Sequence, residues 1–294
     1  MSPEMRGHLA MLLFSVLVAG SFSLGALVAN EIDPAALNAV RFLIAAVVIG
    51  GLANLTIGFE RRYFHAPWRY LLLGGAFATF FVLMFEGLKT ASPISISAMS
   101  TLMPLMSAGF GYLLLRQLVT PRMALALSVG AVGALWVIFR ADLSALLQLQ
   151  IGQGEMIFFW GCMAHALYTP LVRKLNRGEP VIVFSFGVMV AGLILLLAYG
   201  WRDVLATDWA GLPGIVLVVL LYLALITSAV TFVLLQFATL RLPAAKVMAY
   251  TYLTPSWVML WEAALGNGLP SVSVFFGVAL TALALFILLK NEEG

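Results

Sequence analysis

Two ionisable side chains lie inside long apolar stretches of this sequence, where their chemistry would act in a nonpolar environment. Arg41 falls about two turns inside the segment that begins at Pro34, and His165 lies within the segment that begins at Gly154. An ionisable group inside a membrane is costly, so each one needs a partner or a function. Arg41 either extends to the surface and pairs with helix-end carbonyls, or binds the carboxylate of a solute as a two-pronged donor. His165 is either a neutral hydrogen-bond partner or a titrating group.

Aromatic and polar side chains accompany these two residues. Apolar walls with a few polar groups would hold a solute that has a ring and charged ends. Tyr250, Thr254 and Trp257 recur at helical spacing on one face, whereas Tyr252 lies toward another. Contact with lipid at the membrane interface is the alternative for the aromatic residues, and helix packing is the favoured alternative for Thr101. The predicted substrate-binding residues are Ser21, Phe22, Asn38, Arg41, Thr101, His165, Tyr168, Gln236, Tyr250, Tyr252 and Trp257.

The composition indicates that a bilayer surrounds these residues. Of the 294 residues, 63% are hydrophobic and only 10% are charged, against about a quarter charged in soluble domains. The mean hydropathy is +1.05. Basic residues are scattered without a basic face, which argues against nucleic-acid binding. Cys162 is the single cysteine, so the chain forms neither an intrachain disulfide nor a cysteine zinc site.

The apolar stretches predict an all-α integral membrane protein with ten transmembrane helices. A bilayer core needs about 20 apolar residues per helix, and the uniformly apolar runs differ from the alternating pattern of barrel strands. The predicted helices span residues 9–29, 34–57, 68–88, 93–115, 121–139, 154–172, 180–199, 212–239, 244–265 and 270–289.

The basic residues predict the orientation of these helices. With a cytoplasmic N-terminus, 12 of the 16 Lys and Arg residues fall in cytoplasmic loops and three fall in outer loops. This bias places both termini in the cytoplasm.

Paired prolines indicate an internal repeat. Pro93 and Pro104 in the first half match Pro243 and Pro255 in the second half at nearly the same spacing. We therefore predict two five-helix domains, residues 1–140 and 141–294, and the odd number of helices inverts the second domain in the membrane. Because proline inside a helix removes a hydrogen bond, Pro104 and Pro255 should kink their helices, and we predict that they act as hinges.

Short motifs across nearly the whole chain resemble those of the drug/metabolite transporter superfamily. The motifs are Gly20-Ser21-Phe22, Arg41-Phe42, Leu102-Met103-Pro104-Leu105, Ala166-Leu167-Tyr168-Thr169 and Leu253-Thr254-Pro255. Their arrangement resembles two tandem EamA-type domains, and the overall pattern is most similar to bacterial aromatic amino acid exporters of the YddG type. This resemblance implies no cofactor and the efflux of amino acids, metabolites or drugs.

The sequence also departs from the family pattern at four positions. Ala19 and His165 stand where the family often has Trp, and Gln117 and Asn267 stand where it usually carries Glu.

We therefore expect a secondary transporter that exports aromatic and other hydrophobic amino acids by alternating access. The alternative is a proton-coupled drug/metabolite antiporter, in which His165 would titrate. Glu86 and Glu262 lie near outer helix ends, where water should reach them, and no carboxylate lies near mid-membrane. Downhill export and proton coupling both stay open.

An integral membrane enzyme is the non-transporter alternative. The chain has no HExxH motif and only three scattered histidines, so no catalytic residues and no metal are expected. A channel would differ from a carrier in lacking saturable transport. The expected partners are a small-molecule substrate and the lipid bilayer, with no nucleic acid. The expected location is the cell inner membrane, as a multi-pass protein whose ten helices fit within one monomer.

Overall fold

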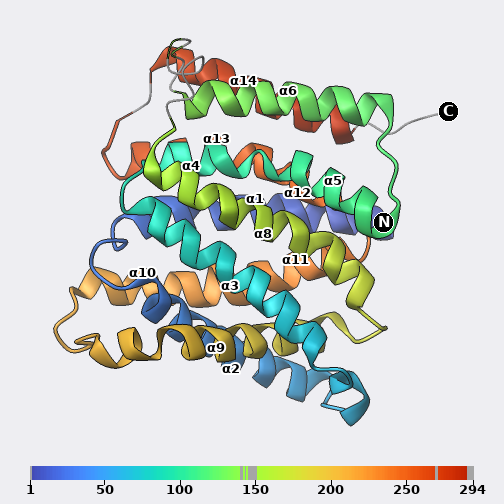
Figure 1. Cartoon of the computed structure of the whole chain (residues 1–294), viewed down its shortest axis with the longest axis vertical. Helices are drawn as coiled ribbons and strands as arrows, with labels where there is room; N and C mark the ends of the chain where they lie inside the picture. The colour runs from blue at the N-terminus through green and yellow to red at the C-terminus, as the bar shows by residue number, and fades with distance from the viewer. Residues whose placement is uncertain (1, 140–141, 143, 145–150, 269–270, 290–294) are drawn as a thin grey trace.

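A computed structural model describes the chain except for residues 1, 140–141, 143, 145–150, 269–270 and 290–294. Its regular elements are helices whose axes run roughly parallel across the molecule (Figure 1). In the first half these are α1 (Pro3–Ala26), α2 (Pro34–Thr56), α3 (Trp68–Leu88), α4 (Pro93–Ser100), α5 (Met103–Leu115) and α6 (Pro121–Ile138). In the second half they are α8 (Gln153–Leu175), α9 (Val181–Ala206), α10 (Gly214–Ala224), α11 (Thr231–Thr239), α12 (Ala244–Ala249), α13 (Thr254–Ala264) and α14 (Val272–Leu289).

Four helices of the first half begin with the same local arrangement. A capping side chain accepts a hydrogen bond from a backbone N–H of the first turn, and proline follows it. Proline costs nothing at this position because its missing N–H would have no partner inside the helix. The capping residues are Ser2, Asp33, Ser92 and Thr120.

Three membrane-length helices are interrupted. α4 ends at Ser100 and α5 begins just before Pro104, while the 3₁₀ turn η3 (Tyr250–Leu253) separates α12 from α13 just before Pro255. The predicted kinks at the two prolines therefore occur at matching positions. The wide π-helical turn η2 (Leu225–Val230) joins α10 to α11, and turns of this kind are often found at functional sites.

Counted with these interruptions, the described part of the chain contains the ten helices predicted from the sequence. Seven of them are long and apolar enough to cross a membrane by length and composition: α1, α2, α3, α4–α5, α6, α9 and α10–α11. The predicted bounds differ mainly at α1, which begins at Pro3 because Ser2 caps it, and at α9, which continues to Ala206 across a bend at Gly200.

The two halves of the chain interleave. α3 packs on α8 and α9, and in the corresponding arrangement α10–α11 pack on α1 and α2. α2 packs on α9, and α6 packs on α14. This exchange of equivalent partners is the pattern expected of two related five-helix units. The predicted domain boundary at residues 140 and 141 lies outside the described residues.

The α6–α14 pair depends on glycine. A Cβ atom on Gly133 would lie 2.6 Å from the carbonyl oxygen of Gly277, and one on Gly277 would lie 2.8 Å from the carbonyl oxygen of Gly133. Only glycine at both positions lets the two backbones approach this closely. The contact explains how this pair holds together beside the rest of the bundle (Figure 1).

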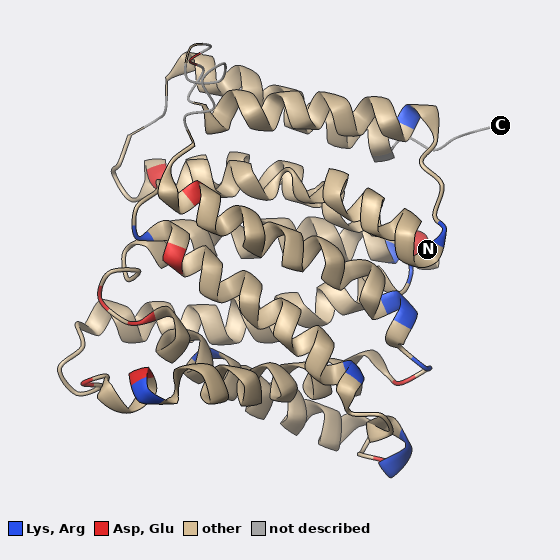
Figure 2. Cartoon of the chain, viewed as in Figure 1, with Lys and Arg blue, Asp and Glu red and all other residues tan. Residues whose placement is uncertain are grey.

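Charge is distributed unequally between the two ends of the bundle. Most Lys and Arg residues gather at the end where α1 begins and α14 ends, here called the basic end (Figure 2). Most Asp and Glu residues lie at the opposite end, here called the acidic end. The loops predicted from the sequence to be cytoplasmic are those at the basic end.

Candidate functional site

An aromatic wall runs along α3 in the interior of the bundle. Phe77, Phe80 and Phe81 share one face because their spacing is i, i+3 and i+4. The Phe77 ring centroid lies 4.4 Å from that of Phe232 on α11, and the Phe80 centroid lies 4.4 Å from that of His165 on α8. The wall therefore joins α3 to the second half of the chain.

A small cavity of about 20 Å³, here called the central cavity, lies against this wall. Its lining comes from both halves of the chain and includes Phe14, Val18, Phe22, Phe77, Phe80, Phe81, Ser100, Met103, His165, Thr231, Thr251 and Thr254. The volume suits about one water molecule, whereas small-molecule sites usually measure about 300–1,000 Å³. A solute would fit here only after the surrounding helices move apart.

Arg41 on α2 is fully buried beside the aromatic wall. Its Nε donates to Ser228 Oγ at 2.5 Å, and a terminal nitrogen donates to the carbonyl oxygen and to Oγ1 of Thr227, both at 3.1 Å. The guanidinium carbon lies 3.7 Å from the centroid of the Phe81 ring. Arg41 thus does not extend to the surface. The π-helical turn η2 supplies the polar groups that hold it.

The positive charge of Arg41 has no carboxylate within 4.0 Å among the described residues. A buried cation of this kind is costly when no anion balances it. Asn38 Oδ1 accepts a long hydrogen bond from Arg41 at 3.4 Å, while Asn38 Nδ2 donates to the Pro34 carbonyl oxygen at 2.8 Å. Neutral oxygens and the Phe81 ring therefore surround the guanidinium, and none of these groups balances its charge.

Buried polar side chains without partners lie around the aromatic wall. Neither ring nitrogen of His165 has a hydrogen-bond partner, and His165 lines the central cavity. One turn further along α8, the Tyr168 hydroxyl comes near the Gln236 amide. Neither of those groups makes a hydrogen bond of good geometry. Such groups are rare in protein interiors, and sites that bind a polar ligand are one explanation for them.

Several predicted site residues lie outside this cluster. The Tyr250 hydroxyl lies 3.0 Å from His8 Nδ1, and Trp257 Nε1 donates to Ser15 Oγ at 3.3 Å, so both residues join α1. The Tyr252 ring packs against Gly130 of α6. Thr101 donates to a carbonyl oxygen of its own helix. These four residues make packing contacts between or within helices.

Two more predicted residues, Ser21 and Phe22, lie on α1. Phe22 lines the central cavity, whereas Ser21 is fully buried and its hydroxyl has no partner. Glu262 is buried rather than exposed to water as expected, and it accepts a hydrogen bond from Asn267 at 2.9 Å.

The sequence did not single out the α3 wall or the residues of η2. The spacing of Phe77, Phe80 and Phe81 is a signal that could have identified the wall. Thr227 and Ser228 carry no comparable signal, because nothing in the local sequence marks a π-helical turn.

Helices α3, α4 and α8 contact one another closely at the acidic end. Ser95 Oγ donates to Glu155 Oε1 at 2.6 Å, and both residues are buried. A Cβ atom on Gly87 would lie 2.8 Å from the carbonyl oxygen of Gly154, so α3 and α8 also approach closely at this end.

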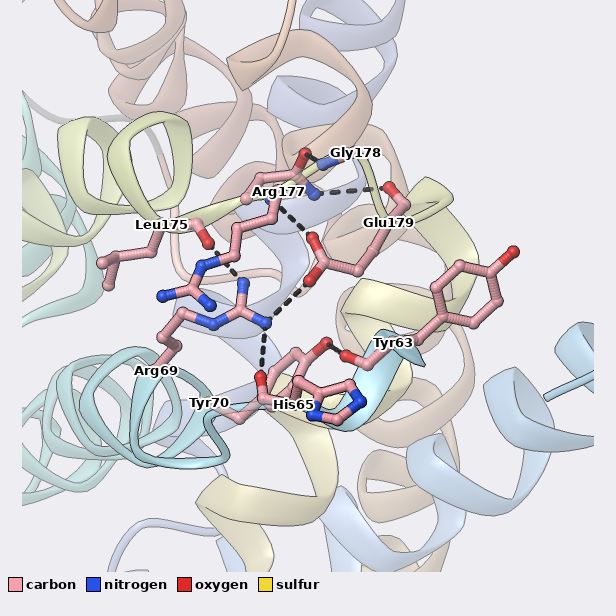
Figure 3. A network of polar contacts seen from close by, with 9 residues as sticks. Tyr63, His65, Arg69, Tyr70, Leu175, Arg177, Gly178 and Glu179 are labelled. Carbon is pink, nitrogen blue, oxygen red and sulfur yellow. Dashed lines mark hydrogen bonds and ion pairs between the residues drawn. The ribbon is translucent and has the colours of Figure 1, made fainter. Parts of the chain in front are cut away.

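At the basic end, Arg69 and Glu179 form a buried ion pair that joins α3 to the start of α9 (Figure 3). Arg69 Nη2 lies 2.7 Å from Glu179 Oε1, and Arg69 also donates to the carbonyl oxygens of Leu175 and His65. Burial by itself would raise the pKa of Glu179, but hydrogen bonds from Arg69 and from the Arg177 backbone N–H outweigh it and lower that pKa.

Comparisons with known proteins agree with this architecture. A profile of the EamA-like transporter family matches residues 5–139 and again residues 152–290. The uncharacterised transporter YyaM of Bacillus subtilis (strain 168) is 25% identical over 264 residues, which are 88% of this chain and 86% of that protein. One solved crystal structure has the same fold, with a TM-score of 0.73 at 18% identity over 98% of this chain and 97% of the other.

Proposed function

The chain belongs to the EamA-like transporter family, and from that premise we propose that it exports solutes that combine a carboxylate with an apolar side chain. It is a multi-pass membrane transporter rather than an enzyme. Within the proposal, aromatic and other hydrophobic amino acids are the main substrates, as the resemblance to YddG-type exporters predicts. We propose that the protein lies in the cell inner membrane with its basic end in the cytoplasm.

The observation that carries this proposal is the isolated charge of Arg41 against the aromatic wall. A guanidinium presents paired N–H donors that match a carboxylate, and pairing with one would balance its buried charge. Phe81, Phe80 and Phe77 extend from that point toward the central cavity. A solute with its carboxylate on Arg41 would therefore lay its side chain along phenyl rings.

The proposed mechanism is alternating access. The central cavity is too small for an amino acid, so binding requires rearrangement of the interrupted helices α4–α5 and α12–α13. Breaks next to Pro104 and Pro255 lie at corresponding places in the two halves, which supports their role as hinges. In this mechanism the Ser95–Glu155 hydrogen bond, which joins α4 to α8 at the acidic end, breaks when that end opens.

Proton-coupled antiport is the second candidate function. His165 favours it, because this histidine lines the central cavity with both ring nitrogens unpartnered. Protonation coupled to solute binding would then drive transport.

Uptake into proteoliposomes tests both candidates. Radiolabelled phenylalanine, tryptophan, methionine and a cationic drug would be supplied with and without a pH gradient. The proposal expects saturable uptake of the three amino acids, mutual competition among them, and no dependence on the gradient. Drug uptake that requires the gradient, without amino acid uptake, would contradict the proposal and favour the antiporter.

A further inference from the structure

A second and much larger cavity, of about 690 Å³, lies at the basic end. Its wall combines residues from α1, α5, α6, α8, α12 and α14. Three cationic side chains, Arg122, Arg173 and Lys246, face it, together with one carboxylate, Glu4. A concave site with an excess of positive charge attracts and concentrates anions.

Two of these cations have unused capacity to bind an anion. Lys246 makes no ion pair or hydrogen bond with the described residues. Arg173 donates one long hydrogen bond, at 3.3 Å, to the Leu242 carbonyl oxygen, and it makes no ion pair with a described carboxylate. Arg122 donates to the Ile287 carbonyl oxygen at 2.9 Å. A guanidinium has five N–H donors, so Arg173 keeps several for a ligand.

The large cavity is lined by some of the same helices as the central cavity. On α5, Ala108 lines the large cavity and Met103 lines the central one. On α12 and η3, Lys246 lines the large cavity and Thr251 lines the central one. Five residues of helix span about 7.5 Å along its axis. The two cavities are therefore consecutive along one pair of interrupted helices.

We infer that this cavity is a docking site for the carboxylate of the transported solute, bound by Lys246 and Arg173 before the solute reaches Arg41. The inference rests on the proposed function and assigns its first binding step. The position of this cavity next to the central cavity, on the same two interrupted helices, favours a solute that moves onward over a lipid headgroup that stays in place. The apolar part of the wall, including Ala108 and Leu288, would contact the side chain of the solute.

Kinetics at the basic end test this inference. The variants are Lys246→Gln, Arg173→Gln and their combination, and the control is Lys174→Gln, which removes an exposed cation next to Arg173 but outside the cavity. Phenylalanine uptake would be measured in everted membrane vesicles, which present the basic end to the medium. The double variant should raise KM about tenfold with kcat unchanged, because it removes attraction before the central site is occupied. This effect should shrink in about 0.5 M salt, since salt screens charges that water reaches.

The outcomes separate the carboxylate docking site from a bound lipid phosphate, and failure of the docking site from failure of the proposed function. Unchanged KM in the double variant, while wild-type protein transports phenylalanine, overturns the docking site alone. Absence of phenylalanine uptake by wild-type protein instead contradicts the proposed function. The assay is repeated in reconstituted vesicles of phosphatidylcholine with and without phosphatidylglycerol. If wild-type protein needs phosphatidylglycerol for uptake and the double variant does not, the ligand of this cavity is a lipid phosphate, which overturns the inference.

Discussion

The guanidinium carbon of Arg41 lies 3.7 Å from the centroid of the Phe81 ring, so this buried charge, which has no carboxylate partner among the described residues, lies against an aromatic face. A ring in this position attracts a cation electrostatically but does not accept the strong hydrogen bonds from its N–H groups that a water oxygen would. Phe81 therefore holds the guanidinium in place while leaving part of it for a ligand.

Phe81→Leu should weaken substrate binding because the ring no longer positions Arg41. We expect a roughly tenfold higher KM for phenylalanine, in line with a cation–π contact removed from water. Phe81→Tyr, which keeps an aromatic face, is the matched control and should stay within about threefold of wild type. Equal KM values for the leucine and tyrosine variants would argue that the ring only fills space.

The Arg69–Glu179 pair should stabilise the basic end. Glu179→Gln leaves Arg69 buried without its anion, and we expect the free energy of unfolding to fall by about 2 kcal/mol. This is a modest value for a buried pair, because Arg69 keeps its hydrogen bonds to the carbonyl oxygens of Leu175 and His65. Glu60→Gln, in the exposed pair with Arg62, should leave the apparent Tm unchanged. Thermal unfolding in detergent at pH 7 compares them, and equal Tm values for wild type and Glu179→Gln would contradict the expected role.

The stabilisation by Glu179 should depend on pH. Its folded-state pKa is lowered below the unfolded value of about 4.3, so the contribution is fully present above that value. It should disappear as the pH falls through the lower, folded-state pKa. The difference in Tm between wild type and Glu179→Gln should therefore narrow in acid. A difference that stays constant or widens as the pH falls would show that the ionised carboxylate is not its source.

The Ser95–Glu155 hydrogen bond should keep the acidic end closed. Ser95→Ala removes the donor to a buried carboxylate, which costs about 1.5 kcal/mol or more and should favour the open conformation. Maleimide labelling of Ala91→Cys, in a chain whose Cys162 is replaced by Ala, would measure opening. We expect labelling about ten times faster than without Ser95→Ala. The control is Ser273→Ala, which changes an exposed serine at the same end. Equal labelling rates in the parent protein, the Ser95→Ala variant and the Ser273→Ala variant would show that the Ser95–Glu155 hydrogen bond does not hold this end closed.

The α6–α14 contact should tolerate no side chain at Gly133. Gly133→Ala places a methyl group against the Gly277 carbonyl and should lower the apparent Tm by several degrees. Gly109→Ala is the matched control, since a Cβ there meets no atom within 4 Å and alanine favours the helix. A Tm for Gly133→Ala at or above that of Gly109→Ala would mean that the two helices can separate without cost.

The helices could be predicted from sequence because the bilayer imposes length and apolarity on them. α3 begins and ends at the predicted residues, and the breaks near Pro104 and Pro255 follow from the chemistry of proline. The environment of Arg41 was harder to predict from the sequence. Its partners Thr227 and Ser228 are 186 and 187 residues away and depend on a π-helical turn without a local sequence signal.

Side-chain direction was the other limit of the sequence. Helical spacing grouped Tyr250, Thr254 and Trp257 on one face, and in the structure that face meets α1, but of the three only Thr254 lines the central cavity. Spacing along a helix therefore does not tell which residues of one face make packing contacts and which line a cavity.

The most direct test compares phenylalanine with phenylalaninamide, which lacks the carboxylate, in proteoliposomes of wild-type protein and of Arg41→Gln. Wild-type protein should take up phenylalanine saturably and phenylalaninamide poorly. Arg41→Gln should lose at least tenfold in kcat/KM for phenylalanine while its apparent Tm is maintained, because the substitution removes an unbalanced buried charge. Equal uptake of the two compounds by wild-type protein, or undiminished phenylalanine uptake by Arg41→Gln, would contradict the account.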